Sequence, residues 1–338
     1  MVELSPALFY FVVFVASWLG TGVILLIAHR RSLLAVPNDR SSHSIPTPFG
    51  GGIVIILALI AAWQFADMGQ SGGLTSIGYV LAVTGGIALF SFIDDVRELP
   101  VSFRLAIQIG AIVFILNASP SPLNYFGGIL PPAWDNIAAG LIWLWFINLF
   151  NFMDGIDGIA GIELISLGSG IAIIAVIAEL NADYFWLSLT ISAAAFGFLW
   201  WNWQPAKIFL GDVGSVPLGF FLGWLLLMLA AEGQWAAALI LPLYYLADTT
   251  ITLVRRALHG EKFWRAHNQH YYQRAVQRGL SHRHVTIVVA IANTGLIGCA
   301  ILSTIYQPWL PLIGGAIITA LLLLYLKNKI PTIFGKSS

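Results

Sequence analysis

Long apolar runs separated by short polar connectors make up the hydrophobic pattern of this chain. A helix needs about 20 apolar residues to cross a bilayer. About eleven runs approach that length, and together they predict an all-α, polytopic integral membrane helical bundle. The predicted spans are 6–28, 49–66, 75–93, 101–117, 134–152, 159–179, 184–201, 215–231, 235–254, 285–306 and 309–326.

The composition agrees with this class. Of the 338 residues, 58% are hydrophobic and only 9% are charged, whereas a soluble globular chain carries roughly 25% charged residues. No internal repeat or soluble domain is evident, so residues 1–338 are predicted to form a single transmembrane domain. The first run, 6–28, is too long for a signal-peptide core and is expected to stay as a span. The lone Cys299 cannot form an internal disulfide.

The basic residues fall on alternate connectors, which predicts an orientation. Basic residues mark the cytoplasmic side of a membrane protein, so the N-terminus is expected outside and the C-terminus in the cytoplasm. An odd number of spans requires the same arrangement. Every Lys, and every Arg but Arg104, lies in one of the connectors 29–48, 94–100, 153–158, 202–214 and 255–283 or in the tail 327–338.

The most informative stretch is 148–161, which reads Asn-Leu-Phe-Asn-Phe-Met-Asp-Gly-Ile-Asp-Gly-Ile-Ala-Gly. Asp154 and Asp157 are each followed by Gly, which allows positive φ and close backbone approach. Together with Asn148 and Asn151 they predict a loop that aims oxygen ligands at one point, the kind of ligand that Mg²⁺ prefers. The alternative is a polar turn between two membrane helices, because Asp-Gly is common turn chemistry.

Six aspartates cluster at the cytoplasmic ends of the predicted spans. Carboxylates at membrane depth are costly and usually functional. Two of the six are adjacent and repel each other unless a cation or a shared proton intervenes, although such a pair could also simply end a helix. The six are Asp94, Asp95, Asp154, Asp157, Asp212 and Asp248.

Two further connectors carry candidate chemistry at their glycines and prolines. Gly211 and Gly214 flank Asp212, so backbone N–H groups there are expected to reach a phosphate at a helix start; the alternative is a helix capped by Ser215. Connector 29–48 contains His43 among prolines and is followed by glycines, which predicts a loop of defined shape. The alternative is a basic surface loop.

Connector 255–283 is long enough to hold structure of its own. His267, His270 and Arg274 are spaced three and four apart, so on a helix they would share one face. Aromatic residues at 263, 264, 271 and 272 predict a helix lying at the membrane interface. No Cys or acidic third ligand accompanies the two His, which disfavours zinc and favours a cationic face for a phosphate. The alternative is a basic helix that binds only lipid head groups.

Taken together, these motifs resemble those of the polyprenyl-phosphate N-acetylhexosamine-1-phosphate transferases. The resemblance runs from Pro37 to Arg274, through the loops 29–48, 94–100, 148–161, 202–215 and 255–283. The matching motifs are Pro37-Asn-x-Arg-x-x-His43, Phe-Ile-Asp94-Asp95, Asn148-x-x-Asn151-x-x-Asp154-Gly-x-Asp157-Gly and Phe209-x-Gly-Asp212-x-Gly-Ser.

The resemblance implies a role for each matching residue. Mg²⁺, with Mn²⁺ as a possible substitute, would bind Asp212 together with Asn151 or Asp154. The implied catalytic residues are Asp94, Asp95, Asp154 and Asp212, of which the first two would orient or deprotonate a lipid phosphate. Among the implied substrate-binding residues, Phe209 would stack on uracil, and Asn202 and Asp157 would line the nucleoside pocket. Four residues would hold the pyrophosphate or the sugar: Arg265, His267, His270 and Arg274. Asn151 and, in the first loop, His43 complete the implied set.

The resemblance also implies a reaction and partners. The enzyme would sit in the bacterial inner membrane and transfer N-acetylhexosamine-1-phosphate from a UDP-sugar to undecaprenyl phosphate, releasing UMP. Membrane lipids and a second copy of the chain, in a homodimer, are expected as partners, and nucleic acid is not. Glu98 stands where members of the family often carry Asp or Lys, and the two His in 255–283 are separated, whereas the family's murein translocase has a run of adjacent His. These departures disfavour UDP-MurNAc-pentapeptide. The pattern is closer to the branch that starts O-antigen chains on UDP-GlcNAc, UDP-FucNAc or UDP-QuiNAc.

Two other classes of membrane protein also use clustered Asp residues. An intramembrane aspartyl protease would need Gly where Phe209 stands, two residues before Gly211, and its Asp would lie in mid-span. A transporter would carry carboxylates near span centres on broken helices, whereas the clustered Asp lie at span ends.

Overall fold

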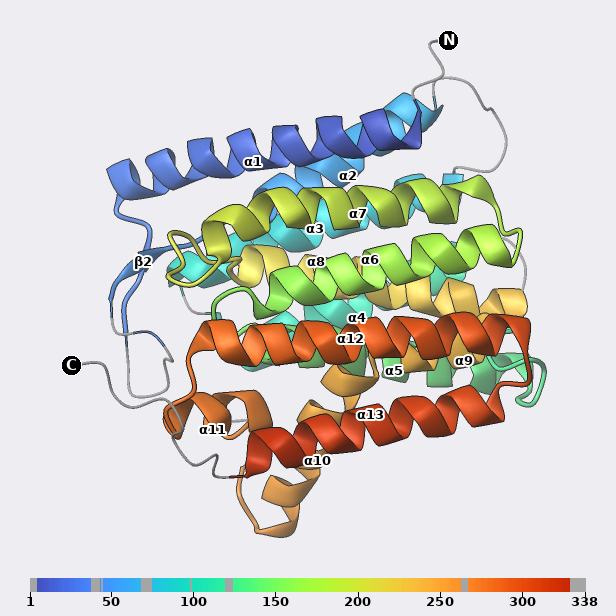
Figure 1. Cartoon of the computed structure of the whole chain (residues 1–338). Helices are drawn as coiled ribbons and strands as arrows, with labels where there is room; N and C mark the ends of the chain where they lie inside the picture. Colours follow the sequence, from blue (N-terminus) through green and yellow to red (C-terminus); the bar gives the residue numbers. More distant parts are fainter. Residues whose placement is uncertain are drawn as a thin grey trace.

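The computed structural model describes residues 5–37, 43, 45–67, 75–97, 99–118, 124–262 and 267–328. Its helices run side by side as a bundle, and a small two-stranded ribbon lies at one end (Figure 1). The elements are α1 Pro6–Arg31, β1 Leu34–Ala35, β2 Thr47–Pro48, α2 Gly52–Asp67, α3 Thr75–Arg97, α4 Val101–Ala118, α5 Pro132–Phe152, α6 Ile159–Ile177, α7 Ala182–Asn202, α8 Asp212–Leu229, a π-turn Ala230–Gln234, α9 Trp235–Ile240, α10 Leu243–Leu258, α11 Tyr271–Gln277, α12 His282–Ile305 and α13 Trp309–Lys327.

The predicted polytopic helical bundle is confirmed. In the described part of the chain, nine helices are long and apolar enough to cross a membrane. The predicted span 49–66 forms the shorter helix α2. In Figure 1, α1 starts at the right end of the bundle and α13 ends at the left end, as an odd number of crossings requires. Which end faces the cytoplasm stays a prediction.

The predicted span 235–254 is not one continuous helix. The apolar run that begins at Asp212 continues through the π-turn to Ile240. The chain then breaks at Leu241–Pro242, and α10 begins at Leu243. Proline has no N–H for a helix and its ring clashes with the preceding turn, so Pro242 accounts for the break. In Figure 1, α10 leaves the bundle near α13 at its lower edge.

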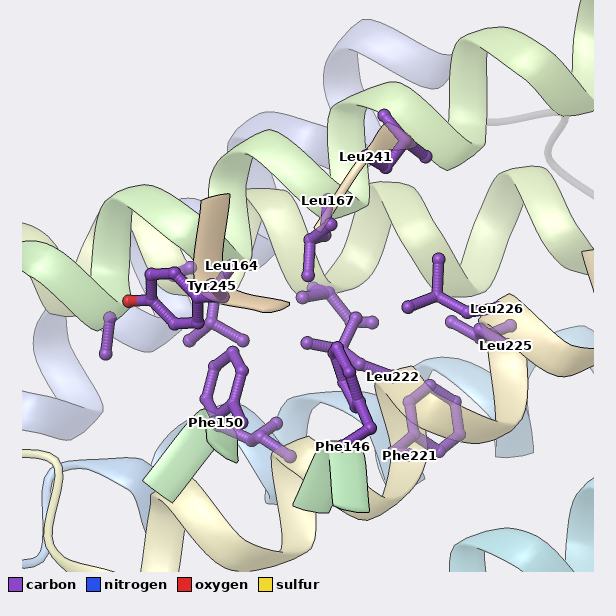
Figure 2. Packing of buried hydrophobic residues seen from close by; sticks show 14 of the residues in the cluster. Phe146, Phe150, Leu164, Leu167, Phe221, Leu222, Leu225, Leu226, Leu241 and Tyr245 are labelled. Atoms are coloured by element: carbon purple, nitrogen blue, oxygen red, sulfur yellow. The ribbon is translucent and has the colours of Figure 1, made fainter. Parts of the chain in front are cut away.

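The core lies around α8, whose residues are buried on nearly every side. A helix that is apolar all round belongs inside a larger assembly. Figure 2 shows Phe146 of α5 beside Leu222 and Phe221 of α8, and Phe150 of α5 beside Leu164 of α6 and Tyr245 of α10. Between membrane helices van der Waals contact replaces hydrophobic driving force, so this dense packing fixes where the helix ends lie.

The starts of α2 and α8 meet at one end of the bundle, called the site end from here on. Phe209 N–H donates to the Pro48 carbonyl at 2.8 Å, and Gly51 N–H donates to the Phe209 carbonyl at 3.0 Å. A Cβ added to Gly52 would lie 2.2 Å from the Cα of Gly214. Backbone contact this close is possible only between glycines, so this pair aligns the loop before α8 with the loop before α2.

Candidate active site

The predicted catalytic aspartates come together at the site end, from three different elements. Asp94 and Asp95 lie near the end of α3, and Asp212 is the first residue of α8. Asn151 lies in the last turn of α5, and Asp154 in the loop that follows. Helix ends that are far apart in sequence thus supply carboxylates and an amide to one place.

Asp95 holds the start of α8. Its Oδ1 accepts the backbone N–H of Asp212 at 3.1 Å, and its Oδ2 accepts that of Val213 at 2.9 Å. The first N–H groups of a helix have no partner within the helix, and a carboxylate there also complements the helix dipole. Gly211, with φ of 78°, makes room, because a Cβ there would lie 3.0 Å from Asp95 Oδ2.

This arrangement corrects the prediction for the Gly-flanked helix start. The amides that were expected to reach a phosphate are used by a carboxylate of the protein itself. The alternative with Ser215 as the cap is also wrong, because Gly211 is the N-cap residue. The Ser215 hydroxyl lies inside the helix and donates back to the Gly211 carbonyl at 3.2 Å.

The side chain of Asp212 is held by Asn151 and approached by Arg104. Asn151 Nδ2 lies 2.8 Å from Asp212 Oδ1 and 2.8 Å from Ser215 Oγ. Arg104 Nη1 lies 3.6 Å from Asp212 Oδ2 and 3.0 Å from Asp94 Oδ2. One guanidinium therefore partly offsets two carboxylates. Asp94 is further fixed by the N–H of Leu99, 2.6 Å from its Oδ1.

Asp154 is the least engaged carboxylate of the group. Within the described residues no hydrogen bond reaches its side chain. Burial, followed by the nearby charges of Asp212 and Asp157, raises the pKa of Asp154 to about 7. Such a group is poised to lose its proton when a cation arrives.

The donor set can be tested against the cation that the resemblance implies. In the part of the chain that the structure describes, no group of three His, Cys, Asp or Glu side chains could hold a metal by itself. That disfavours zinc, which takes three or four protein ligands. Mg²⁺ usually binds through one or two carboxylates plus the phosphates of a substrate. Asp154 and Asp212, with the oxygen of Asn151 close by, suit it in number and chemistry.

Asp157 and Asn202, predicted in the nucleoside pocket, are buried and bonded to neighbouring loops. Asp157 Oδ2 accepts the N–H of Ala206 at 3.1 Å, and its Oδ1 lies 3.2 Å from His282 Nδ1. Asn202 Oδ1 accepts the N–H of Gly158 at 2.9 Å, and its Nδ2 donates to the Ile208 carbonyl. Both side chains hold the shape of the loops around the site, and a direct contact with substrate stays a prediction.

Phe209 and His43 lie against each other. Their ring centroids are 4.9 Å apart in an edge-to-face arrangement. His43 Nε2 is 3.3 Å from the Ala35 carbonyl, which ties the first loop to β1. Phe209 is only partly buried, so one ring face can still take a flat partner. Stacking on uracil stays a prediction.

The predicted common helix face in 255–283 is wrong. The helix α11 begins only at Tyr271, and the residues from His267 to His270 are not helical. The rings of His267 and His270 still lie near each other, with centroids 4.8 Å apart. Arg274 lies on α11, and its Nη2 is 3.3 Å from Gln269 Oε1.

A second carboxylate explains where α11 begins. Asp248 of α10, fully buried, accepts the N–H of Tyr271 at 2.9 Å and of Tyr272 at 3.3 Å. His270 Nδ1 lies 3.4 Å from Asp248 Oδ1. Tyr272 is buried rather than interfacial, and its hydroxyl donates to the Phe152 carbonyl at 2.9 Å. Connector 255–283 is thereby fastened to the loop that carries Asp154.

Sequence reasoning missed some residues that build the site. Arg104 was noted only for its position among the basic residues, and its ten-residue distance from Asp94 across a short connector was the available signal. His282 gave no local signal, and Tyr272 was interpreted only as an interfacial aromatic residue, because the partners of both lie more than 100 residues away. Arg265 and Glu98 lie outside the described residues.

The fold and the site define a class: a membrane helical bundle with a carboxylate, amide and guanidinium cluster at one end. Comparison with known proteins gives the family. The Glycosyl transferase family 4 profile matches residues 77–230. A phospho-N-acetylmuramoyl-pentapeptide-transferase of Streptococcus suis (strain 05ZYH33) is 32% identical over 245 residues, covering 64% of this chain and 68% of the relative.

Other relatives are covered over a greater length. The probable undecaprenyl-phosphate N-acetylglucosaminyl 1-phosphate transferase of Bacillus subtilis (strain 168) is 27% identical over 284 residues, which is 80% of this chain and 76% of the relative. The decaprenyl-phosphate N-acetylglucosaminephosphotransferase of Mycobacterium leprae (strain TN) is 27% identical over 336 residues, which is 86% of this chain and 82% of the relative. The chain belongs to glycosyl transferase family 4, the family of these polyprenyl-phosphate sugar-phosphate transferases.

Proposed function

We propose that this chain transfers N-acetylhexosamine-1-phosphate from a UDP-sugar to undecaprenyl phosphate at the cytoplasmic face of a bacterial inner membrane. The observation that carries the proposal is the cluster of Asn151, Asp212, Arg104 and Asp94 at one end of the bundle. Its oxygen and guanidinium groups suit a diphosphate with a divalent cation. The activities for which the relatives are named support the same reaction class.

The reaction is a phosphoryl transfer. An oxygen of the lipid phosphate attacks the β-phosphorus of the UDP-sugar and forms a new P–O bond. The bond between that phosphorus and the bridging oxygen breaks, UMP leaves with the electron pair, and a lipid diphosphate sugar remains. Transfers of this kind depend mainly on positioning and on stabilisation of charge.

The residues of the site would divide this work. Asn151 keeps the Asp212 carboxylate aimed into the site, and Arg104 offsets negative charge between Asp94 and Asp212. Asp95 keeps α8 in place. A bound Mg²⁺ ion, or Mn²⁺ in its stead, held by Asp154 and Asp212, would neutralise the diphosphate and help UMP to leave.

The acceptor is expected to approach from the membrane between α4 and α5. An apolar cavity of about 390 Å³ lies there, lined in part by Ile112, Leu116, Ile137 and Leu141. Arg104 lies on the same helix α4, two turns nearer the site end. We assign the cavity to part of the prenyl chain, because a phosphate at Arg104 would place the chain along this helix.

The donor is proposed to be UDP-GlcNAc or a UDP-FucNAc- or UDP-QuiNAc-type relative, for the initiation of O-antigen or a similar surface polysaccharide. Relatives named for N-acetylglucosamine phosphate transfer cover more of this chain than the pentapeptide transferase does, 80% and 86% against 64%. The motif departures in 255–283 favour the same choice.

The test is direct. Purified protein in lipid nanodiscs is given undecaprenyl phosphate and, in turn, UDP-GlcNAc, UDP-FucNAc, UDP-QuiNAc or UDP-MurNAc-pentapeptide, and UMP and the lipid product are measured by mass spectrometry. Stoichiometric UMP and lipid diphosphate sugar are expected with one of the first three donors. Asp183→Asn, at the opposite end of the bundle, is the matched control for site substitutions. UMP release without lipid product, or product only from the pentapeptide donor, would contradict the proposal.

A further inference from the structure

A polar pocket lies at the end of α10, apart from the carboxylate cluster. It has a volume of about 230 Å³. The lining residues come from the last turn of α10, from the turn that follows it, from the segment just before α11 and from α11 itself. They are Arg255, Arg256, His259, Glu261, Gln269 and Arg274. Arg274 thus belongs to this pocket, together with Arg255 and Arg256, which lie outside the motifs of the resemblance.

The pocket carries an excess of positive charge. Three arginines face one glutamate, Glu261, whose Oε2 lies 3.1 Å from Arg256 Nη1. Gln269 contributes an amide, which donates to Glu261 Oε2 at 3.2 Å and accepts from Arg274 Nη2 at 3.3 Å. Among these six described residues, two positive charges remain after the glutamate is counted, and none of the six side chains is apolar.

Two of these guanidinium groups hold buried N–H groups with no partner in the described part of the chain. Arg256 is only 6% exposed, and its Nε has no hydrogen-bond acceptor. Arg255 Nη2 is buried and equally unpaired. Buried polar groups in native proteins are nearly always satisfied, so the unpaired donors call for an acceptor group from a ligand. An oxyanion supplies several acceptor oxygens and forms charge-assisted hydrogen bonds with arginine.

The surface beside the pocket is apolar. Ile251, Val254 and Leu258 of α10 are 43%, 52% and 81% exposed. They are spaced three and four apart, so they form one stripe along the helix. The helix itself stands at the lower edge of the bundle, next to α13 (Figure 1). An apolar stripe that ends beside an arginine pocket matches a lipid, with chains on the stripe and a phosphate in the pocket.

The lining also argues against a nucleotide. A uridine needs a flat surface to stack on, and among the lining residues that the structure describes the only ring is that of the exposed His259. The partly exposed ring of Phe209 lies in the other loop, with His43.

We propose that this pocket binds the phosphate of an anionic membrane phospholipid, whose acyl chains lie along Ile251, Val254 and Leu258. Basic pockets at the ends of membrane helices are typical binding sites for such head groups. The bound lipid would brace α10 and, through Asp248, the start of α11. The pocket shares no lining residue with the carboxylate cluster, and the proposed lipid site does not depend on which donor the enzyme uses.

The test uses purified full-length protein in phosphatidylcholine nanodiscs. Dioleoylphosphatidylglycerol is added in steps, while the thermal unfolding midpoint and the lipids retained in native mass spectrometry are recorded. The wild type should retain the anionic lipid and unfold at a higher temperature. The double substitution Arg255→Gln with Arg274→Gln should weaken retention about tenfold or more, the loss expected for charge-assisted hydrogen bonds. Arg30→Gln with Arg31→Gln, which removes the same charge from the exposed end of α1, should bind as the wild type does.

A second variant guards against loss of folding in the first. Glu261→Gln removes the only acidic group among the described lining residues and should strengthen retention of phosphatidylglycerol. Equal retention in both double substitutions, or weaker retention in Glu261→Gln, would overturn the proposal. So would a stability shift that inorganic phosphate alone reproduces, because the pocket would then serve a free anion. Displacement of the lipid by UDP-GlcNAc would instead assign the pocket to the donor.

Discussion

The carboxylate of Asp95 accepts the backbone N–H of Asp212 at 3.1 Å. One site aspartate therefore holds the main chain of another, across 117 positions of sequence. Asp248 does the same for α11, where it accepts the N–H groups of Tyr271 and Tyr272. Not every one of the six clustered aspartates is free for chemistry, because Asp95 and Asp248 accept backbone N–H groups at helix starts.

Substitution of Asp95 by Asn should therefore lower stability as well as activity. An Asn carbonyl can accept one of the two amides, and its NH₂ group then faces the other. Loss of a helix cap costs about 1–2 kcal/mol of unfolding free energy. Asp212 should shift with its helix, and kcat should fall at least about tenfold, since each 1.36 kcal/mol of lost transition-state stabilisation is a factor of ten.

The measurement pairs a thermal unfolding curve with kcat for UMP release. Asp183→Asn, at the start of α7, serves as the control and should change neither. If Asp95→Asn abolished turnover while stability stayed at the wild-type value, Asp95 would act on the substrate itself rather than through α8.

The contact between Gly52 and Gly214 gives a second prediction. A Cβ on Gly52 would lie 2.2 Å from the Cα of Gly214, so backbone must move to admit it. Overpacking of this kind costs about 1–3 kcal/mol, and the shift falls directly on the helix that carries Asp212. Gly52→Ala should lower both the unfolding midpoint and kcat.

Gly86→Ala is the matched control for this change. Gly86 also lies in a membrane helix, α3, but nothing lies within 4 Å of the position where its Cβ would be. Alanine is favoured over glycine in a helix by roughly 0.8–1 kcal/mol, so this variant should be as stable as the wild type or more so. Equal effects of the two substitutions would show that the close crossing of α2 and α8 is unimportant.

The sequence predicted the bundle and the carboxylate cluster for the same physical reason. Apolar runs of bilayer length leave few places for charge, so Asp94, Asp95, Asp154 and Asp212 had to gather at span ends. What each carboxylate does there depends on contacts between distant elements. Asp95 finds its partners 117 and 118 positions away, and no local pattern records such a pair.

The same limit explains the errors in connector 255–283. Spacing placed His267, His270 and Arg274 on one helix face, but spacing carries meaning only where a helix exists. The helix starts at Tyr271 because Asp248, more than 20 residues earlier, accepts its first amides. The break after Ile240 was easier to predict from the sequence, because Pro242 stands within the predicted span 235–254.

The ring of His267 gives a prediction about pH. Burial, then the charges of His270 and Arg256, lower the pKa of His267 to about 4, with Arg274 acting in the same direction and Asp248 against it. Between pH 6.5, the ordinary value for His, and about 4, the unfolded chain binds a proton here that the folded chain does not. The contribution of the His267 ring to the free energy of unfolding is therefore fully present above pH 6.5 and is lost as the pH falls toward 4.

His267→Gln should remove that part of the pH dependence. The wild type should lose more of its unfolding midpoint between pH 7.5 and pH 5 than the variant does, as measured by thermal unfolding at several pH values. His259→Gln is a suitable control, because His259 is exposed in the turn after α10. Parallel curves for the wild type and His267→Gln would contradict the prediction.

The last prediction concerns Asp212, which the proposed function makes a metal ligand. In Asp212→Asn the new side-chain oxygen can still accept from Asn151 Nδ2, which lies 2.8 Å away in the wild type. The fold should therefore persist. Turnover should fall by a hundredfold or more, on the order of 3 kcal/mol of transition-state stabilisation.

Binding of Mn²⁺ in place of Mg²⁺, followed by electron paramagnetic resonance in the presence of UDP-GlcNAc, should weaken in parallel. A chelator should abolish wild-type activity and added Mg²⁺ should restore it, while Asp183→Asn should behave as the wild type in every assay. Near-normal turnover of the wild type in metal-free buffer would remove the cation from the mechanism and leave Arg104 as the main counter-charge to the diphosphate.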